Sequence, residues 1–177
     1  MHPTPGPAHP LKPSADPAAP EPPAPGSRLF FVGIGGVSMA GLAEMARAAG
    51  FRPMGSDRHG SDRTRHLESL GIPVVEGHRA DTVDAFRPDL LVYSAAVPRD
   101  NPERIRAGEL GIPAVDRATF LGWLNLGYER VLNVAGTHGK TTTTSLVTCV
   151  LAEAGVDPTF VIGGKLNSAG ANSRLGS

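Results

Sequence analysis

The chain has 177 residues, enough for one complete domain and part of a second, and 40% hydrophobic with 19% charged residues is typical of a globular protein. Lysine plus arginine equals aspartate plus glutamate at 17 each, so no basic field favours binding to nucleic acid or to an anionic membrane surface. No apolar run approaches the roughly 20 residues that span a bilayer, and the N-terminus lacks the apolar core of a signal peptide, so we expect a cytoplasmic protein.

The N-terminal segment, residues 1–27, is rich in proline and poor in large apolar side chains. It holds ten of the 17 prolines of the chain. Such a segment cannot bury enough surface to offset the entropy lost on ordering, so we expect a disordered tail. A proline-rich ligand for a recognition module is the alternative interpretation.

Strands and helices are predicted to alternate from Arg28 onward. The apolar run Leu29–Val32 is typical of a buried parallel strand, and a glycine-rich turn and a helix ending near Gly50 follow it. Further strands are expected at 51–55, 72–75, 89–93 and 112–115, and further helices at 64–70, 81–86, from 102 and at 117–126. This alternation predicts an α/β fold with a Rossmann-like, doubly wound parallel sheet over residues 28–127.

The first glycine loop, with Gly33, Gly35 and Gly36, follows the first strand. The dinucleotide fingerprint G-x-G-x-x-G requires a further glycine where Ser38 stands, whereas Asp57, 24 residues after Gly33, occupies the place of the ribose-binding acid. The pattern therefore favours a nucleotide diphosphate at the carboxyl ends of the strands without specifying NAD. Tight packing of helix on strand, or an NAD(P)-binding oxidoreductase domain, are the alternatives.

A second glycine loop follows the apolar run Val131–Val134, which we expect to be a strand, and precedes a predicted helix at 141–154. The loop reads G-x-x-G-K-T from Gly136 to Thr141, two residues shorter than the common phosphate loop. Glycines let backbone N–H groups converge on an anion, and the helix N-terminus adds its positive dipole end. Lys140 would reach the terminal phosphates, the Thr141 hydroxyl would meet Mg²⁺, and a polar contact of His138 with nucleotide is favoured over core packing.

The remaining segments suggest a second domain that is only begun. A hinge is expected at 127–129, and a second strand at 159–162 before two glycines. One strand-helix-strand unit leaves unpaired sheet edges and little core, so we expect residues 128–177 to be a truncated piece of a larger domain. His78 is either a cleft residue or a plain loop histidine, and Arg117 either reaches a substrate phosphate or lies in solvent.

Taken together, the residues resemble the Mur ligase family, and the resemblance covers nearly everything from Arg28 to the end of the chain. It rests on Phe31–Glu44, Gly55–Asp57, Ser94–Val97, Asp100–Glu103, Ala135–Thr143 and Asp157–Gly164. The family has an N-terminal Rossmann-like domain for a UDP-sugar, a central ATPase domain and a C-terminal amino-acid-binding domain. The resemblance therefore implies that residues 128–177 begin a P-loop α/β ATPase domain.

The resemblance also implies two groups of site residues. Those for the UDP-sugar are Gly33, Gly35, Gly36, Ser38, Ser56, Asp57, Ser94, Ala95 and Ala96. Those for ATP are Gly136, Thr137, His138, Gly139, Lys140, Thr141 and Thr142. Among the latter, the implied catalytic residues are Lys140, Thr141 and His138, and Thr141 is the implied ligand of Mg²⁺.

The reaction that the resemblance implies is the joining of L-alanine to UDP-N-acetylmuramate in peptidoglycan biosynthesis. ATP phosphorylates the lactyl carboxylate, which is a poor electrophile, and the amine then displaces phosphate from the acyl phosphate. These residues do not distinguish a family member that adds L-alanine from one that adds a whole murein peptide. The family's Mg²⁺-binding glutamate and its amino-acid domain would follow Ser177, so we expect this chain alone to be inactive.

Overall fold

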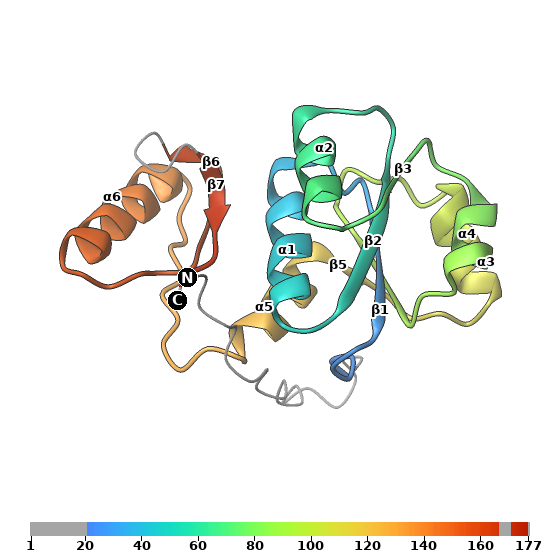
Figure 1. Ribbon diagram of the computed structural model, residues 1–177, viewed down its shortest axis with the longest axis horizontal. Helices are drawn as coiled ribbons and strands as arrows, with labels where there is room; N and C mark the ends of the chain where they lie inside the picture. Colours follow the sequence, from blue (N-terminus) through green and yellow to red (C-terminus); the bar gives the residue numbers. More distant parts are fainter. Residues whose placement is uncertain (1–20, 167–170, 177) are drawn as a thin grey trace.

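The computed structural model describes residues 21–166 and 171–176. Figure 1 shows a larger α/β part and a smaller part made of one helix and a hairpin. Most of the tail predicted at 1–27 lies outside the described residues, and residues 21–27 form neither helix nor strand. Within the described ranges, no helix combines the length and apolarity needed to cross a membrane.

The larger part is built on a five-stranded parallel sheet with the strand order β3-β2-β1-β4-β5. The strands are β1 (Arg28–Val32), β2 (Arg52–Asp57), β3 (Val74–Glu76), β4 (Leu90–Tyr93) and β5 (Ala114–Asp116). The order reverses between β1 and β4, and ligands of such sheets bind at the carboxyl ends of the strands beside this switch point. The predicted doubly wound fold is confirmed, with strand bounds within about two residues of those expected.

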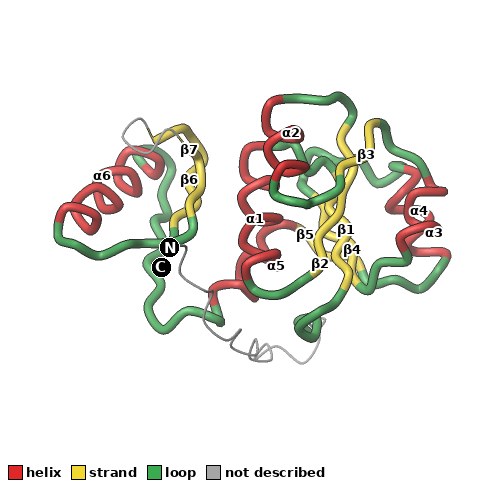
Figure 2. The backbone as a smooth tube through the Cα atoms, in the orientation of Figure 1, coloured by secondary structure: helices red, strands yellow, loops and turns green. Residues whose placement is uncertain are grey.

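Helices cover both faces of the sheet, as Figure 2 shows. They are α1 (Val37–Ala48), α2 (Asp62–Ser69), α3 (Ala80–Phe86), α4 (Pro102–Glu109) and α5 (Arg117–Asn125). Phe31 on one face packs against α1 and α5, with its ring 5.5 Å from that of Phe120. Phe30 on the other face packs with Val83 of α3 and Ala107 of α4. Alternate side chains of β1 thus enter both cores, which explains its unbroken apolar sequence.

Helix starts divide into two kinds. The Asn101 side chain accepts hydrogen bonds from the backbone N–H groups of Glu103 and Arg104 and caps α4, as predicted, and Ser61 and Asp116 cap α2 and α5 in the same way. By contrast, the N-cap residues of α1 and α6 (Lys140–Glu153) are Gly36 and Gly139 and that of α3 is Arg79, with no side-chain cap at any of the three. An uncapped first turn leaves backbone N–H groups for a ligand.

The smaller part contains α6 and an antiparallel hairpin of β6 (Phe160–Leu166) and β7 (Ala171–Arg174). The helix predicted at 141–154 is confirmed. The strand predicted at Val131–Val134 is wrong, because residues 131–135 have no regular structure and Leu132 is 68% exposed. A parallel strand needs a neighbour for its N–H and C=O groups, and among the described residues this part offers only the β6–β7 hairpin.

The hairpin also departs from the predicted pattern, since β6 continues through the two glycines at 163 and 164 and β7 was not predicted. It packs against α1, where Val161 joins the core cluster of the larger part. Gly41 of α1 makes this approach possible, because a Cβ at that position would lie 2.5 Å from the Ser173 hydroxyl oxygen. The contact connects the hairpin to the same helix whose N-terminus faces the first glycine loop.

Candidate functional site

The first glycine loop is shaped by its own backbone hydrogen bonds. The N–H groups of Gly33 and Ile34 donate to the Ser56 carbonyl oxygen at 2.8 and 2.9 Å, and the Gly36 N–H donates to the Gly33 carbonyl at 3.1 Å. Gly33 has a φ of +76°, a left-handed conformation that favours glycine. These bonds turn the chain from β1 into α1 and engage the glycine N–H groups within the protein.

Gly35, the middle glycine, is held on both sides by side chains. Its N–H donates to Asp57 Oδ2 at 2.8 Å, and its carbonyl oxygen accepts a hydrogen bond from Arg63 Nε at 2.6 Å. A Cβ here would lie 2.8 Å from Asp57 Oδ2 and 2.9 Å from the Thr64 methyl carbon, so only glycine fits. One carboxylate oxygen of Asp57, which was predicted to lie near the nucleotide, is therefore hydrogen-bonded to the loop itself.

These bonds decide which groups can meet an anion. Because the N–H groups of Gly33, Gly35 and Gly36 are engaged, the groups available in the first turn of α1 are the N–H groups of Val37 and Ser38 and the Ser38 hydroxyl. The glycines predicted to lie against the diphosphate thus shape the loop, and Ser38 stands at the helix end that can bind it. Arg63, which sequence reasoning missed, adds a positive charge beside the loop.

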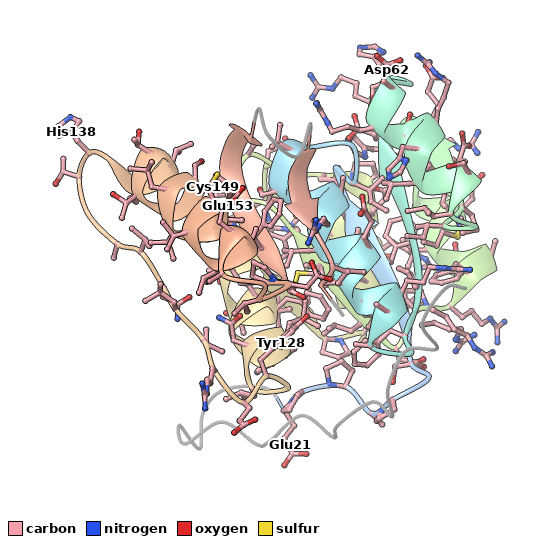
Figure 3. All side chains as sticks on the ribbon, turned by 60° about the vertical axis from the view of Figure 1, so that its left-hand side comes forward. Glu21, Asp62, Tyr128, His138, Cys149 and Glu153 are labelled. Carbon is pink, nitrogen blue, oxygen red and sulfur yellow. The ribbon has the colours of Figure 1, made fainter. Side chains whose placement is uncertain are left out.

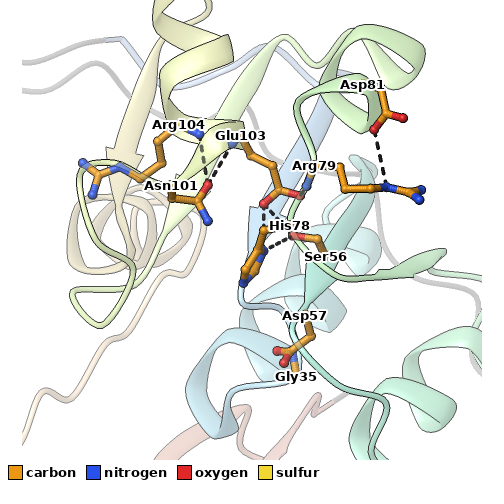
Figure 4. A network of polar contacts seen from close by, with 9 residues as sticks. All are labelled: Gly35, Ser56, Asp57, His78, Arg79, Asp81, Asn101, Glu103 and Arg104. Atoms are coloured by element: carbon orange, nitrogen blue, oxygen red, sulfur yellow. Dashed lines mark hydrogen bonds and ion pairs between the residues drawn. The ribbon is translucent and has the colours of Figure 1, made fainter.

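A buried polar network joins the ends of β2 and β3 to the start of α4 (Figure 4). The Ser56 hydroxyl donates to Glu103 Oε2 at 2.7 Å, and His78 Nδ1 lies 3.0 Å from that oxygen and 3.0 Å from Ser56 Oγ. Glu103 is 0% exposed, and burial raises the pKa of its carboxyl, partly offset by the Ser56 hydroxyl and His78. A buried acid with these partners fixes the geometry of the surrounding loops.

Sequence reasoning left His78 between a cleft residue and a loop residue, and it did not single out Glu103. The network places His78 at the cleft. Glu103 lies in the first turn of a capped helix, where an acidic residue ordinarily stabilises the helix dipole, so the local sequence carries no signal of its buried role. Arg117 begins α5, and nothing in the described structure brings it to the first glycine loop.

The loop after β4 closes the opposite side of the cleft. Ser94, Ala95 and Ala96 follow β4 directly, and Ala96 lines a cavity of about 230 Å³ with Arg58, His78, Val97, Pro98, Asp100, Asn101 and Pro102. Val97 lies 3.7 Å from the position of a Cβ on Gly33, so the loops after β1 and β4 are neighbours. The structure therefore brings the predicted UDP-sugar residues together at the switch point of the sheet.

The second glycine loop is exposed from Gly136 to Thr142. Gly136 and Gly139 have φ values of +155° and +79°, and the Lys140 ammonium donates to the carbonyl oxygens of Gly136 and Thr137. Figure 3 shows His138 at the outer turn of this loop. The lysine thus lies inside the curl of the loop, where it can exchange carbonyl oxygens for phosphate oxygens.

The loop residues fit a phosphate group and, less completely, Mg²⁺. The uncapped start of α6 and the two glycines suit an anion, and Thr141 offers an exposed hydroxyl in the first turn. Within the described residues, no cluster of three or more His, Cys, Asp or Glu could hold a metal ion. A magnesium ion here would rely on Thr141, the phosphates and water, in keeping with the few protein ligands that Mg²⁺ takes at nucleotide sites.

A family model and the sequences of curated proteins both match this chain to Mur ligases. The family model described as Mur ligase family, catalytic domain, matches residues 28–128. UDP-N-acetylmuramate--L-alanine ligases from Neisseria gonorrhoeae and Methylibium petroleiphilum are 51% and 54% identical to the chain, over 85% and 84% of its length and 31% of theirs. The chain thus spans about a third of the length of these curated relatives.

Solved structures match the same region. The UDP-N-acetylmuramate-alanine ligase from Thermotoga maritima has a TM-score of 0.76 at 36% identity, over 85% of this chain and 35% of that one. The UDP-N-acetylmuramate:L-alanyl-gamma-D-glutamyl-meso-diaminopimelate ligase from Neisseria meningitides has a TM-score of 0.77 at 39% identity, over 84% of this chain and 46% of that one. The names of both enzymes contain UDP-N-acetylmuramate, and they differ in what is added to it.

Proposed function

The chain belongs to the Mur ligase family, and from this premise we propose that it serves an ATP-dependent ligase that joins L-alanine to UDP-N-acetylmuramate in peptidoglycan biosynthesis. The relatives that share 51% and 54% of its residues bear that activity in their names. In this proposal residues 28–127 form the UDP-sugar-binding domain, and residues 128–177 begin the ATP-binding domain. The similarity to the peptide-adding ligase supports the same UDP-sugar, since the names of both kinds of ligase contain it.

The observation that carries the proposal is the uncapped start of α1 at the switch point of the sheet. The N–H groups of Val37 and Ser38, with the Ser38 hydroxyl, form a site for the diphosphate, and the loops with Ser56–Asp57 and Ser94–Ala96 enclose the rest of the UDP-sugar. An NAD site is less well supported, because one carboxylate oxygen of Asp57 accepts a hydrogen bond from the Gly35 N–H, which leaves only the other oxygen for a ribose.

The ATP part of the proposal rests on residues 136–142. Lys140 would neutralise phosphate oxygens, His138 would contact the nucleotide from the outer turn, and Thr141 would help to hold Mg²⁺, which stabilises charge on a transferring phosphoryl group. Phosphorylation converts the lactyl carboxylate into an acyl phosphate with a good leaving group, and the L-alanine amine attacks it. We expect no turnover from these 177 residues alone.

Calorimetric titration of the 177-residue chain tests the proposal. We expect saturable binding of UDP-N-acetylmuramate and none of NADH at comparable concentrations. Ser38→Ala removes the hydroxyl from the first turn of α1 and keeps a good helix former there, so it should weaken UDP-sugar binding with little loss of stability. Saturable NADH binding without UDP-sugar binding would overturn the proposal.

A further inference from the structure

A second compartment adjoins the glycine loop at the carboxyl edge of the sheet. It is the cavity of about 230 Å³ whose polar side chains include Arg58, His78, Asp100 and Asn101. Pockets that enclose a whole drug-sized ligand measure about 300–1,000 Å³, so this cavity suits one end of a ligand. Arg58 and Asp100 carry opposite charges, so the cavity has no net charge with which to attract a phosphate. A neutral polar ring is the better occupant.

His78 presents a defined atom to this cavity. Its Nδ1 lies 3.0 Å from Glu103 Oε2 and 3.0 Å from Ser56 Oγ, and the Ser56 hydroxyl gives its hydrogen to that same Oε2, so both neighbours accept and Nδ1 carries the proton of the uncharged ring. The other ring nitrogen, Nε2, is then an acceptor. Figure 4 shows it on the side of the ring away from Glu103. Ser56, whose hydroxyl also donates to Glu103, holds the carboxylate in place.

Asn101 presents the complementary atom. Its Oδ1 accepts the N–H groups of Glu103 and Arg104 at 2.9 and 3.2 Å, and because backbone N–H groups only donate, the oxygen must face the helix. The amide nitrogen therefore faces away from α4, as Figure 4 shows, and in the described part of the chain no hydrogen bond engages it. Asn101 is only 5% exposed, so this donor is fixed at the cavity.

We propose that Asn101 and His78 recognise the edge of the uracil base, an inference that rests on the proposed binding of a UDP-sugar. Uracil presents carbonyl oxygens on either side of its N3–H group, so Asn101 Nδ2 donates to a carbonyl oxygen and His78 Nε2 accepts from N3–H. Cytosine presents an unprotonated N3 at the same edge, so it would face His78 Nε2 with acceptor against acceptor. With Asn101 on the C4 side of the base, the cytosine amino group would also face the Asn101 donor. Glu103 is the positioning residue that sets the tautomer of His78.

Binding of UDP and CDP to the 177-residue chain tests this assignment by calorimetry. We expect UDP to bind at least about tenfold more tightly than CDP, since leaving polar groups mispaired costs that much or more. Asn101→Asp keeps an oxygen to cap α4 but replaces the donor, and His78→Ala removes the acceptor. Each should weaken UDP binding about tenfold and bring the ratio of UDP to CDP affinity close to one.

Asp116→Asn is the matched control, because it exchanges the same two residue types at the cap of α5, away from the cavity. It should leave both affinities unchanged. Equal affinity of the unsubstituted chain for UDP and CDP would overturn base recognition while leaving the proposed function intact. If Asn101→Asp and His78→Ala each weaken UDP and CDP binding by the same factor, base recognition is also overturned and the proposed function stays intact. Binding of neither nucleotide by the unsubstituted chain would overturn the proposed function together with this inference.

The positioning role of Glu103 has a separate readout. The ¹⁵N shifts of the His78 ring report which nitrogen carries the proton, and we expect the Nδ1–H tautomer in the unsubstituted chain. Glu103→Gln offers an amide in place of the carboxylate, so we expect a mixture of tautomers and a loss of UDP affinity with little change for CDP. An unchanged tautomer with an unchanged UDP preference would show that Glu103 does not position His78.

Discussion

The contact between Gly41 and Ser173 makes a quantitative prediction about how the hairpin docks on α1. A Cβ added at Gly41 would lie 2.5 Å from Ser173 Oγ and 2.6 Å from its Cβ, distances that require the hairpin to shift. Overpacking of this kind costs about 1–3 kcal/mol, whereas replacing a mid-helix glycine with alanine gains up to about 1 kcal/mol. Gly41→Ala should therefore change the free energy of unfolding by between roughly zero and 2 kcal/mol of destabilisation.

Gly122→Ala is the matched control, because Gly122 lies in α5 and a Cβ there meets nothing within 4 Å. It should stabilise the chain by up to about 1 kcal/mol, so the two variants should differ by about 1–3 kcal/mol in urea denaturation. Ser173→Gly removes both opposing atoms and should restore Gly41→Ala in the double variant. The amide resonances of β6 and β7 should shift in Gly41→Ala alone.

If Gly41→Ala stabilises the chain as much as Gly122→Ala does, and the hairpin resonances stay in place, then the hairpin does not depend on this close approach. The argument that Gly41 admits the hairpin to α1 would then be wrong. The outcome matters for function, because α1 carries the proposed diphosphate site at its N-terminus. Docking on its middle would hold the proposed ATP-binding part in a defined position relative to the proposed UDP-sugar site.

Three further predictions concern the two loops and the pH dependence of stability. Gly35→Ala should destabilise the chain by about 1–3 kcal/mol in urea and weaken UDP-sugar binding at least about tenfold by calorimetry, because its Cβ would enter the space of Asp57 and Thr64. Lys140→Ala should abolish binding of ATP while leaving UDP-sugar affinity unchanged, since the hydrogen bonds of Lys140 within the described residues go only to its own loop. An equal loss of both affinities would contradict two separate sites. The Arg28 backbone N–H and guanidinium lower the pKa of Asp89 below 3.8, so its contribution is present above pH 3.8 and is lost as pH falls through the folded-state pKa. The difference in stability between the unsubstituted chain and Asp89→Asn should accordingly shrink from pH 5 to pH 3, and a constant difference would exclude this linkage.

Much of the fold was predictable because its signals are local. The apolar run of β1, the Asn101-Pro102 start of α4 and the regular alternation of strands and helices predicted the parallel sheet within a few residues. The two glycine loops were also found, because an apolar run, glycines and a helix start follow one another directly in the chain. Such patterns reflect backbone sterics and side-chain periodicity within a few residues, and tertiary contacts only reinforce them.

The roles within the site depended on contacts between segments far apart in the sequence. Ser56, His78 and Glu103 are separated by 22 to 47 residues and meet only because β2 and β3 end, and α4 begins, at the same edge. The engagement of the Gly35 N–H by Asp57 likewise depends on the pairing of β1 with β2.

The segment at 131–135 shows a prediction that failed because it used local sequence alone. Its apolar sequence alone predicted a strand, but a strand forms only where a neighbour accepts its N–H groups and donates to its carbonyls. The sequence by itself therefore determined most of the helices and strands of the larger part and the position of the two glycine loops that we propose bind phosphate. Tertiary structure decided which strands find partners and which polar atoms are left to face a ligand, because each hydrogen bond made inside the protein removes a group from recognition.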